Sequence, residues 1–305
     1  MQVPFSILKV LVYFDLFDYP LNQEEIGLFI NQKVNSDELS RGLNQLIDSG
    51  ILFRFKEFYC LKNDPSWVER RKTGNQKAIA TLPTAYRISA FLYSFPFVRG
   101  VGISGSLSKN FADENADIDY FIITKANRLW IARTFMHLYK KLTFLTGRQH
   151  LFCMNYYVDE EALTIVEKNI FTAIEVVTLV PVCGNGSLGN FFAANSWTNS
   201  YYPNYPIDKE GRKKTSHSRL KNLIEWLFSN TLGDRLDNYF MKLTTKRWKT
   251  KEAQHRLNIA GRRMGLQTNK HFSKPNPQHL QRQILELYEK RLKEIRDNHS
   301  FECRV

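Results

Sequence analysis

The apolar residues of the first part of the chain have the spacing of three helices followed by a hairpin. Leu39, Leu43 and Leu46 illustrate the helical spacing, since they form one apolar stripe between polar positions. Asn22 and Ser36 are typical N-cap residues for the second and third helices. The predicted elements are helices at 5–18, 23–31 and 37–48 and strands at 51–55 and 58–61.

The middle of the chain alternates helical patterns with short apolar runs of strand length. Pro96 separates the first long helix of this region from the first strand, and Gly147 ends the second helix. Helices are predicted at 65–94, 128–145 and 168–180, and strands at 98–103, 117–123 and 151–158. This order predicts an α/β (α+β) core over residues 65–182 with a small mixed sheet, preceded by a separate module at 1–64.

Residues 183–208 are rich in Gly, Asn, Ser, Pro and aromatics, which predicts a linker with a short helical insert near 191–197. Its aromatics, Trp197, Tyr201, Tyr202 and Tyr205, have two interpretations. They stack nucleic-acid bases, or they pack on a neighbouring domain, and the second is the more usual role. Beyond the linker the pattern is helical, at 219–230, from 234 to 243 or beyond, 253–263 and 277–297.

The charge of the chain is concentrated after the linker. Residues 209–305 hold 23 Lys and Arg against 10 Asp and Glu, whereas residues 1–208 hold 20 of each, so the net charge of +13 is C-terminal. A mostly α-helical, basic C-terminal domain is therefore predicted. Such a surface attracts RNA, DNA or nucleotide phosphates, although a solvated helical face explains it equally well.

Other features exclude several classes of protein. No apolar stretch reaches transmembrane length, and Lys9 and Asp15 interrupt the N-terminal apolar run, unlike a signal peptide. The four cysteines are widely separated and form no CxxC pair, so neither a zinc site nor a disulfide framework is indicated. We therefore expect a cytoplasmic protein without a membrane partner.

The clearest candidate for chemistry is the stretch 98–124, VRGVGISGSLSKNFADENADIDYFIIT. An apolar strand ends at Gly105-Ser106, ten residues follow, and Asp117 and Asp119 enter a second apolar strand. Alternate residues of a strand point to the same face, so both carboxylates are expected to project together. Strands disfavour Asp, so two on one face indicate a bound cation. The alternative is a pair of exposed surface residues.

This arrangement resembles the signature of the DNA polymerase β-like nucleotidyltransferase superfamily, and the order of elements extends the resemblance to about residues 85–182. The resemblance implies Mg²⁺-dependent transfer of a nucleoside monophosphate from an NTP, with release of pyrophosphate. Asp117 and Asp119 would be catalytic and hold the metal, with two Mg²⁺ ions expected. Gly105 and Ser106 would hold the triphosphate, and Lys109 would neutralise a phosphate.

One position departs from the superfamily pattern. A third carboxylate is expected on the strand at 151–158, but its central polar residue is Asn155. An amide oxygen can bind a metal, but an amide cannot act as a general base. Three readings stay open: the acceptor is deprotonated by other means, Asp159 or Glu160 serves, or the enzyme is slow or inactive. Glu175 lies in an otherwise apolar helix, where a polar cleft or a buried hydrogen bond would explain it.

The module at 1–64 resembles a winged helix-turn-helix, which implies DNA binding through the helix at 37–48. The exposed face of that helix is not strongly basic, so a packing or dimerisation role is the alternative. Two functions follow for the whole chain. The first is an enzyme that acts on an NTP and an unidentified acceptor, which is RNA, protein or a small molecule; a nucleic acid would contact residues 209–305. The second is a nucleotide-sensing DNA-binding regulator whose nucleotidyltransferase core is weak or inactive.

Overall fold

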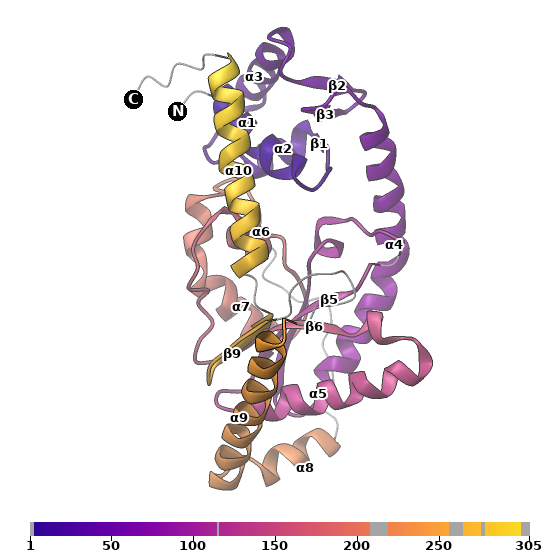
Figure 1. Cartoon of the computed structure of the whole chain (residues 1–305), viewed down its shortest axis with the longest axis vertical. Coiled ribbons are helices and arrows are strands. Elements are labelled where there is room, and N and C mark those ends of the chain that lie inside the picture. Colours follow the sequence, from indigo (N-terminus) through magenta and orange to yellow (C-terminus); the bar gives the residue numbers. More distant parts are fainter. Residues whose placement is uncertain (1–2, 115, 208–218, 256–264, 276–277, 300–305) are drawn as a thin grey trace.

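A computed structural model describes residues 3–114, 116–207, 219–255, 265–275 and 278–299. The expectation of a mixed α and β fold is confirmed: helices and strands alternate along the chain, and the strands of the described residues form two sheets (Figure 1). Within these residues, no helix combines the length and the apolar character needed to cross a membrane.

The N-terminal module follows the predicted order of helices and hairpin, with one further strand. Its elements are α1 (Val3–Asp15), β1 (Leu21–Asn22), α2 (Gln23–Phe29), α3 (Ser36–Asp48), β2 (Phe53–Phe55) and β3 (Phe58–Cys60). The strands form an antiparallel sheet in the order β1-β3-β2. Asn22 caps α2 as expected, but α3 is capped by Asn35 rather than Ser36. The reason is a capping box, in which Asn35 and Glu38 each bind the other's backbone N–H.

Helix α4 (Ser66–Tyr93) runs down one side of the molecule and leads from this module into the central sheet (Figure 1). That sheet has the order β7-β4-β5-β6-β9-β8, and only β5 and β6 are parallel neighbours. Its strands are β4 (Val98–Ser104), β5 (Asp119–Thr124), β6 (Cys153–Asp159), β7 (Val180–Cys183), β8 (Leu266–Thr268) and β9 (Phe272–Pro275). The expectation of a helical C-terminal region misses β8 and β9, which extend the central sheet.

Helices cover both faces of the sheet, as the alternation of side chains along β5 requires. Tyr120 and Ile122 pack in a cluster with α4 and α5 (Leu129–Thr143). Phe121 and Ile123 pack on the other face with α6 (Ile170–Val177) and α7 (Asn185–Ala194). Single turns of 3-10 helix occur at η1 (Leu107–Lys109), η2 (Phe144–Thr146), η3 (Gln149–Leu151) and η4 (Ser196–Ser200). The face beneath α6 and α7 is the one that carries Asp119.

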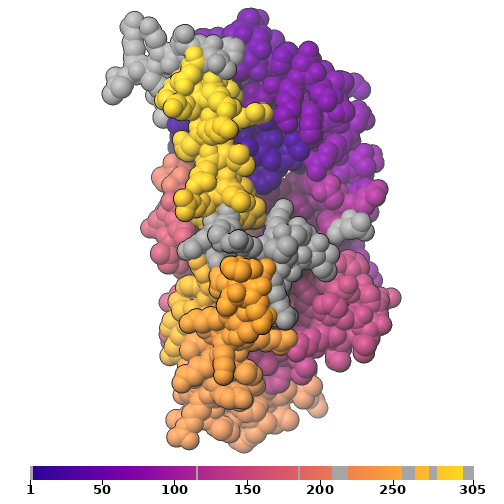
Figure 2. Space-filling model, viewed as in Figure 1, coloured from indigo at the N-terminus to yellow at the C-terminus, as the bar shows by residue number. Residues whose placement is uncertain are grey.

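The C-terminal helices contact widely separated parts of the chain. They are α8 (Arg219–Leu227), α9 (Thr231–Ala253) and α10 (Gln278–His299). Helix α9 packs against α5, where the Ile131 N–H donates to Asp237 Oδ1 (2.9 Å). Helix α10 lies along the N-terminal module (Figure 2), and its Tyr288 ring meets the Tyr13 ring edge-on at 6.2 Å. The helix expected at 253–263 falls mostly outside the described residues.

The aromatic residues of the predicted linker pack on the N-terminal module, so that interpretation is confirmed. Tyr202 is buried in the same cluster as α1 and α2, and Trp197, Tyr201 and Tyr205 pack against this cluster. The Phe29 ring lies 5.6 Å from that of Tyr202 and 5.1 Å from that of Tyr205. These side chains are therefore part of a core and are not free to stack on bases.

Candidate active site

A cavity of about 670 Å³ lies where the N-terminal module, the central sheet, α6 and α10 meet. This volume is in the usual range for a site that binds a small molecule or cofactor. Five of the six residues singled out in the sequence line it, and most of the remaining wall is apolar or aromatic. The five are Gly105, Ser106, Lys109, Asp119 and Asn155.

Gly105 and Asp119 are in contact because β4 and β5 are antiparallel neighbours. Ser104, the last residue of β4, pairs with Asp119, the first residue of β5. Gly105 follows with φ +69°, and a Cβ placed there would overlap Oδ2 of Asp119. This position therefore requires glycine for two reasons, which are the left-handed backbone conformation and the close approach of the Asp119 carboxylate.

Asp119 is half-buried and has an amide beside its carboxylate. Asn155 donates a hydrogen bond from Nδ2 to Asp119 Oδ1, and the Cys153 thiol donates to Asn155 Oδ1 (3.2 Å). Asn155 reaches this position through a shift in the β5–β6 register, with Met154 and Tyr156 pairing with consecutive residues of β5. Burial raises the pKa of Asp119 to about 7, with further contributions from Asp117 and Glu175, against the opposing effects of Cys153 and Lys109.

Lys109 connects the Gly105-Ser106 turn to the far wall of the cavity. Its Nζ lies 2.8 Å from Glu175 Oε1 on α6 and 3.1 Å from the carbonyl oxygen of Gly105. Its own carbonyl accepts a hydrogen bond from the Tyr19 hydroxyl (2.9 Å), which belongs to the N-terminal module. The polar position expected for Glu175 in an apolar helix is thus explained by a cavity wall and an ion pair. The ammonium predicted to meet a phosphate is already paired.

The structure differs from expectation at Asp117. β5 begins at Asp119, so Asp117 precedes the strand, is exposed, and is not part of the cavity wall. The intervening Ile118 is buried. Its N–H donates to the carbonyl of His150 in η3 (3.1 Å), and its carbonyl accepts from the N–H of Cys153 at the start of β6 (3.2 Å). The two carboxylates therefore do not share a strand face.

The alternative third carboxylates lie at the opposite end of β6 from Asn155. Asp159 is fully buried, accepts from the backbone N–H of Asn127 (2.9 Å) and faces His271 Nδ1 (2.9 Å). Glu160 accepts from the Ser187 hydroxyl (2.9 Å). Asp159 thus holds together the loops around β6, and neither residue lines the cavity.

The cavity wall also contains residues that were not anticipated, among them Tyr156, Glu167 and Lys274. Lys274 on β9 is buried and pairs with Glu167 (Nζ to Oε1, 2.6 Å). Its ammonium lies over the rings of Tyr156 (5.7 Å) and Phe272 (5.4 Å). No local pattern pointed to Lys274, because its partner lies 107 positions earlier in the chain.

The described cavity wall offers few side chains that could bind a metal ion. Within the described residues, no group of three or more His, Cys, Asp or Glu side chains could hold a metal ion. Mg²⁺ is commonly held by one or two carboxylates together with substrate phosphates and water. Asp119, with the amide of Asn155 beside it, fits that arrangement for an ion that arrives with a polyphosphate.

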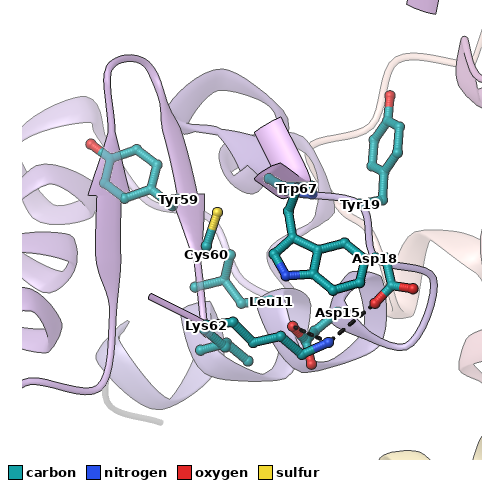
Figure 3. Close-up of a pocket in the computed structure, with 10 residues that line it drawn as sticks. Leu11, Asp15, Asp18, Tyr19, Tyr59, Cys60, Lys62 and Trp67 are labelled. Atoms are coloured by element: carbon teal, nitrogen blue, oxygen red, sulfur yellow. Dashed lines mark hydrogen bonds and ion pairs between the residues drawn. The ribbon is translucent and has the colours of Figure 1, made fainter. Parts of the chain in front are cut away.

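A second hollow, in the N-terminal module, is too small for a substrate. It measures about 20 Å³, roughly the space of a single water. Lys62 lies in it between Asp18 (3.1 Å) and Asp15 (4.0 Å), with its ammonium 4.4 Å from the centre of the Trp67 ring (Figure 3). The charges in this hollow satisfy one another, and its volume leaves no space for a substrate.

Comparison with family models, with curated proteins and with solved structures found no match to this chain.

Proposed function

We propose that this chain is a Mg²⁺-dependent nucleotidyltransferase, which moves a nucleoside monophosphate from an NTP to an acceptor and releases pyrophosphate. One observation carries the proposal: the Asp119 carboxylate lies against the Gly105-Ser106 turn at the wall of a cavity of substrate size. That contact joins the phosphate-binding and metal-binding parts of the predicted motif, and it comes from strand pairing between β4 and β5.

Each residue has a role that follows from its position. The Gly105-Ser106 turn brings backbone N–H groups and the Ser106 hydroxyl to the β- and γ-phosphates. Asp119 is the carboxylate that would hold a metal ion. Asn155 orients Asp119 through its amide N–H and cannot remove a proton from the acceptor. Lys109 is available to a phosphate only after it separates from Glu175.

Bound Mg²⁺ supplies charge neutralisation and polarisation of the phosphate oxygens. Asp119 is on the cavity wall and Asp117 is not, so the described wall supports one ion more directly than the two expected from the motif. Positioning and electrostatic stabilisation would account for most of the rate enhancement, as in other phosphoryl transfers.

A nucleotide-sensing regulator is the second candidate, and Asn155 is the observation that favours it. The N-terminal order α1-β1-α2-α3-β2-β3, with β1 paired to β3, supports the winged-helix-like part of this reading. The exposed face of α3 carries too little positive charge to favour DNA binding. Arg41 is the one cation among its exposed residues, which also include Asp37 and Asp48.

Titration of the purified protein with each NTP and Mg²⁺, with pyrophosphate release followed in parallel, separates the two candidates. A transferase binds the nucleotide and releases pyrophosphate, whereas a sensor binds without release. Asp119→Asn should abolish both Mg²⁺-dependent binding and release, and Asp117→Asn should have a smaller effect because its side chain is outside the cavity wall. Undiminished pyrophosphate release by a variant that carries both Asp117→Asn and Asp119→Asn would refute the assignment.

A further inference from the structure

The order of strands in the central sheet indicates from which side an acceptor would enter. Adjacent strands lie about 4.8 Å apart, and β4, β5, β6 and β9 are consecutive in the sheet. Along this order come the Gly105-Ser106 turn, then Asp119, then Asn155 and Tyr156, and then Lys274. In-line transfer places the leaving pyrophosphate and the attacking atom on opposite sides of the phosphorus. With pyrophosphate at the turn, the acceptor occupies the β6–β9 side.

The wall on that side combines aromatic and aliphatic surface with one ion pair. We call it the acceptor wall, and it consists of Tyr156, Glu167, Lys274, Leu280 and Ile284. The Tyr156 ring meets Phe121 edge-on at 5.4 Å, and Phe121 in turn lies 4.6 Å from Phe191. Leu280 and Ile284 come from the first turns of α10. A flat apolar molecule would find aromatic contacts here of the kind that dominate small-molecule sites.

The charges of the cavity argue against a nucleic-acid acceptor. Its described wall contains two cations, and both are paired: Lys109 with Glu175 (2.8 Å) and Lys274 with Glu167 (2.6 Å). Lys109, on the side of the turn, joins a phosphate of the NTP once it separates from Glu175. Lys274, the described cation on the acceptor side, is held by Glu167, so no described lysine on that side is left to neutralise the phosphates of a nucleic-acid acceptor. Carboxylates and aromatic faces in the cavity favour an uncharged or cationic acceptor.

We propose that the acceptor is a small aromatic molecule, uncharged or cationic, that carries a hydroxyl or amine and binds against the acceptor wall. This inference rests on the proposed function. The acceptor oxygen or nitrogen forms a bond to the α-phosphorus, and the bond from that phosphorus to the bridging oxygen breaks. Pyrophosphate leaves with the electron pair, and the acceptor's proton passes to water. The ion pair of Glu167 and Lys274 offers an acceptor and a donor to the polar end of the molecule.

Binding to the wall can be measured without NTP or Mg²⁺. The probe is the neutral aromatic dye N-phenyl-1-naphthylamine, whose fluorescence rises in apolar surroundings. Leu280→Arg, which places a charge in the cavity wall, should weaken dye binding by about tenfold or more. Leu287→Arg is the matched control, since Leu287 is exposed on the same helix and is not part of the cavity wall.

The second measurement is transfer from α-³²P-labelled NTPs with Mg²⁺ to tyramine, with total tRNA offered in a parallel reaction. Label should appear on tyramine, persist in Leu287→Arg and fall with dye binding in Leu280→Arg. Label on tRNA, displacement of the dye by tRNA, or equal dye binding by the two leucine variants would overturn the inference. If the dye binds as expected and no NTP releases pyrophosphate, the proposed transferase is refuted while the aromatic-binding cavity stands.

Discussion

Replacing Gly105 by alanine tests the contact on which the candidate site depends. Gly105 has φ +69°, and an added Cβ would overlap Oδ2 of Asp119 and lie 3.2 Å from its Cβ and Cγ. The alanine methyl group and the carboxylate cannot both keep their positions, so the side chain of Asp119 must move away from the turn. The substitution therefore acts on the geometry of the site without removing a polar group.

The cost has two parts that a control can separate. A non-glycine residue in the left-handed region costs about 1 to 2 kcal/mol. Crowding of a packed site adds about 1 to 3 kcal/mol. Gly147 has φ +68° but no atom within 4 Å of an added Cβ, so Gly147→Ala measures the first part alone. The free energy of unfolding should thus fall about 1 to 3 kcal/mol further in Gly105→Ala than in Gly147→Ala.

Urea unfolding of the two variants measures this difference, and titration with NTP and Mg²⁺ measures its effect on the site. Gly105→Ala should lose Mg²⁺-dependent nucleotide binding, whereas Gly147→Ala should keep it. If both variants lose equal stability and both still bind the nucleotide, the contact between Gly105 and Asp119 has no role in the site and the reasoning fails.

Three further outcomes are expected. Arg71→Met should destabilise the chain by about 3 to 5 kcal/mol in urea unfolding, since it leaves Glu25 without its buried partner (2.6 Å). Lys77→Met on the same helix is the control and should cost less than about 1 kcal/mol, because the ion pair of Lys77 is solvated. Tyr288→Ala should cost about 3 to 5 kcal/mol if α10 is part of the core around α1, and an unchanged midpoint would show that α10 is dispensable. Burial raises the pKa of Asp237 to about 6, so the folded state keeps a proton that the unfolded state has already released. The free energy of unfolding should therefore decrease as the pH rises from about 4 to about 6. Asp237→Asn should remove this part of the pH dependence, and identical profiles would contradict it.

Local patterns predicted most elements of the first two thirds of the chain. Capping residues, hydrophobic spacing and strand-forming runs act over a few positions, so helices such as α2 and the hairpin β2–β3 were recognisable from their own residues. The Gly105-Ser106 turn between two strands was equally local. Its contact with Asp119 follows from the pairing of β4 with β5, which are neighbours in sequence and in the sheet.

Contacts between distant segments could not be predicted in this way. β8 and β9 are short, and they join the sheet because the edge of β6 offers hydrogen-bonding groups to β9, which in turn pairs with β8. Lys274 reaches the cavity through that pairing, and α10 closes it by packing on α1. Asn155 reaches Asp119 through a register shift, which a pattern of alternating residues cannot specify.

The residues from Val98 to Thr124 by themselves determined a strand, a glycine turn and a carboxylate at the start of the next strand, because hydrogen bonding and sterics over short distances dictate these features. The tertiary structure alone decided that Asp119 faces the cavity while Asp117 lies outside it, and that Glu175 and Lys274 complete the wall. The physical reason is that a cavity is formed by surfaces of elements far apart in the sequence, whose pairing depends on the burial of apolar area over the whole chain.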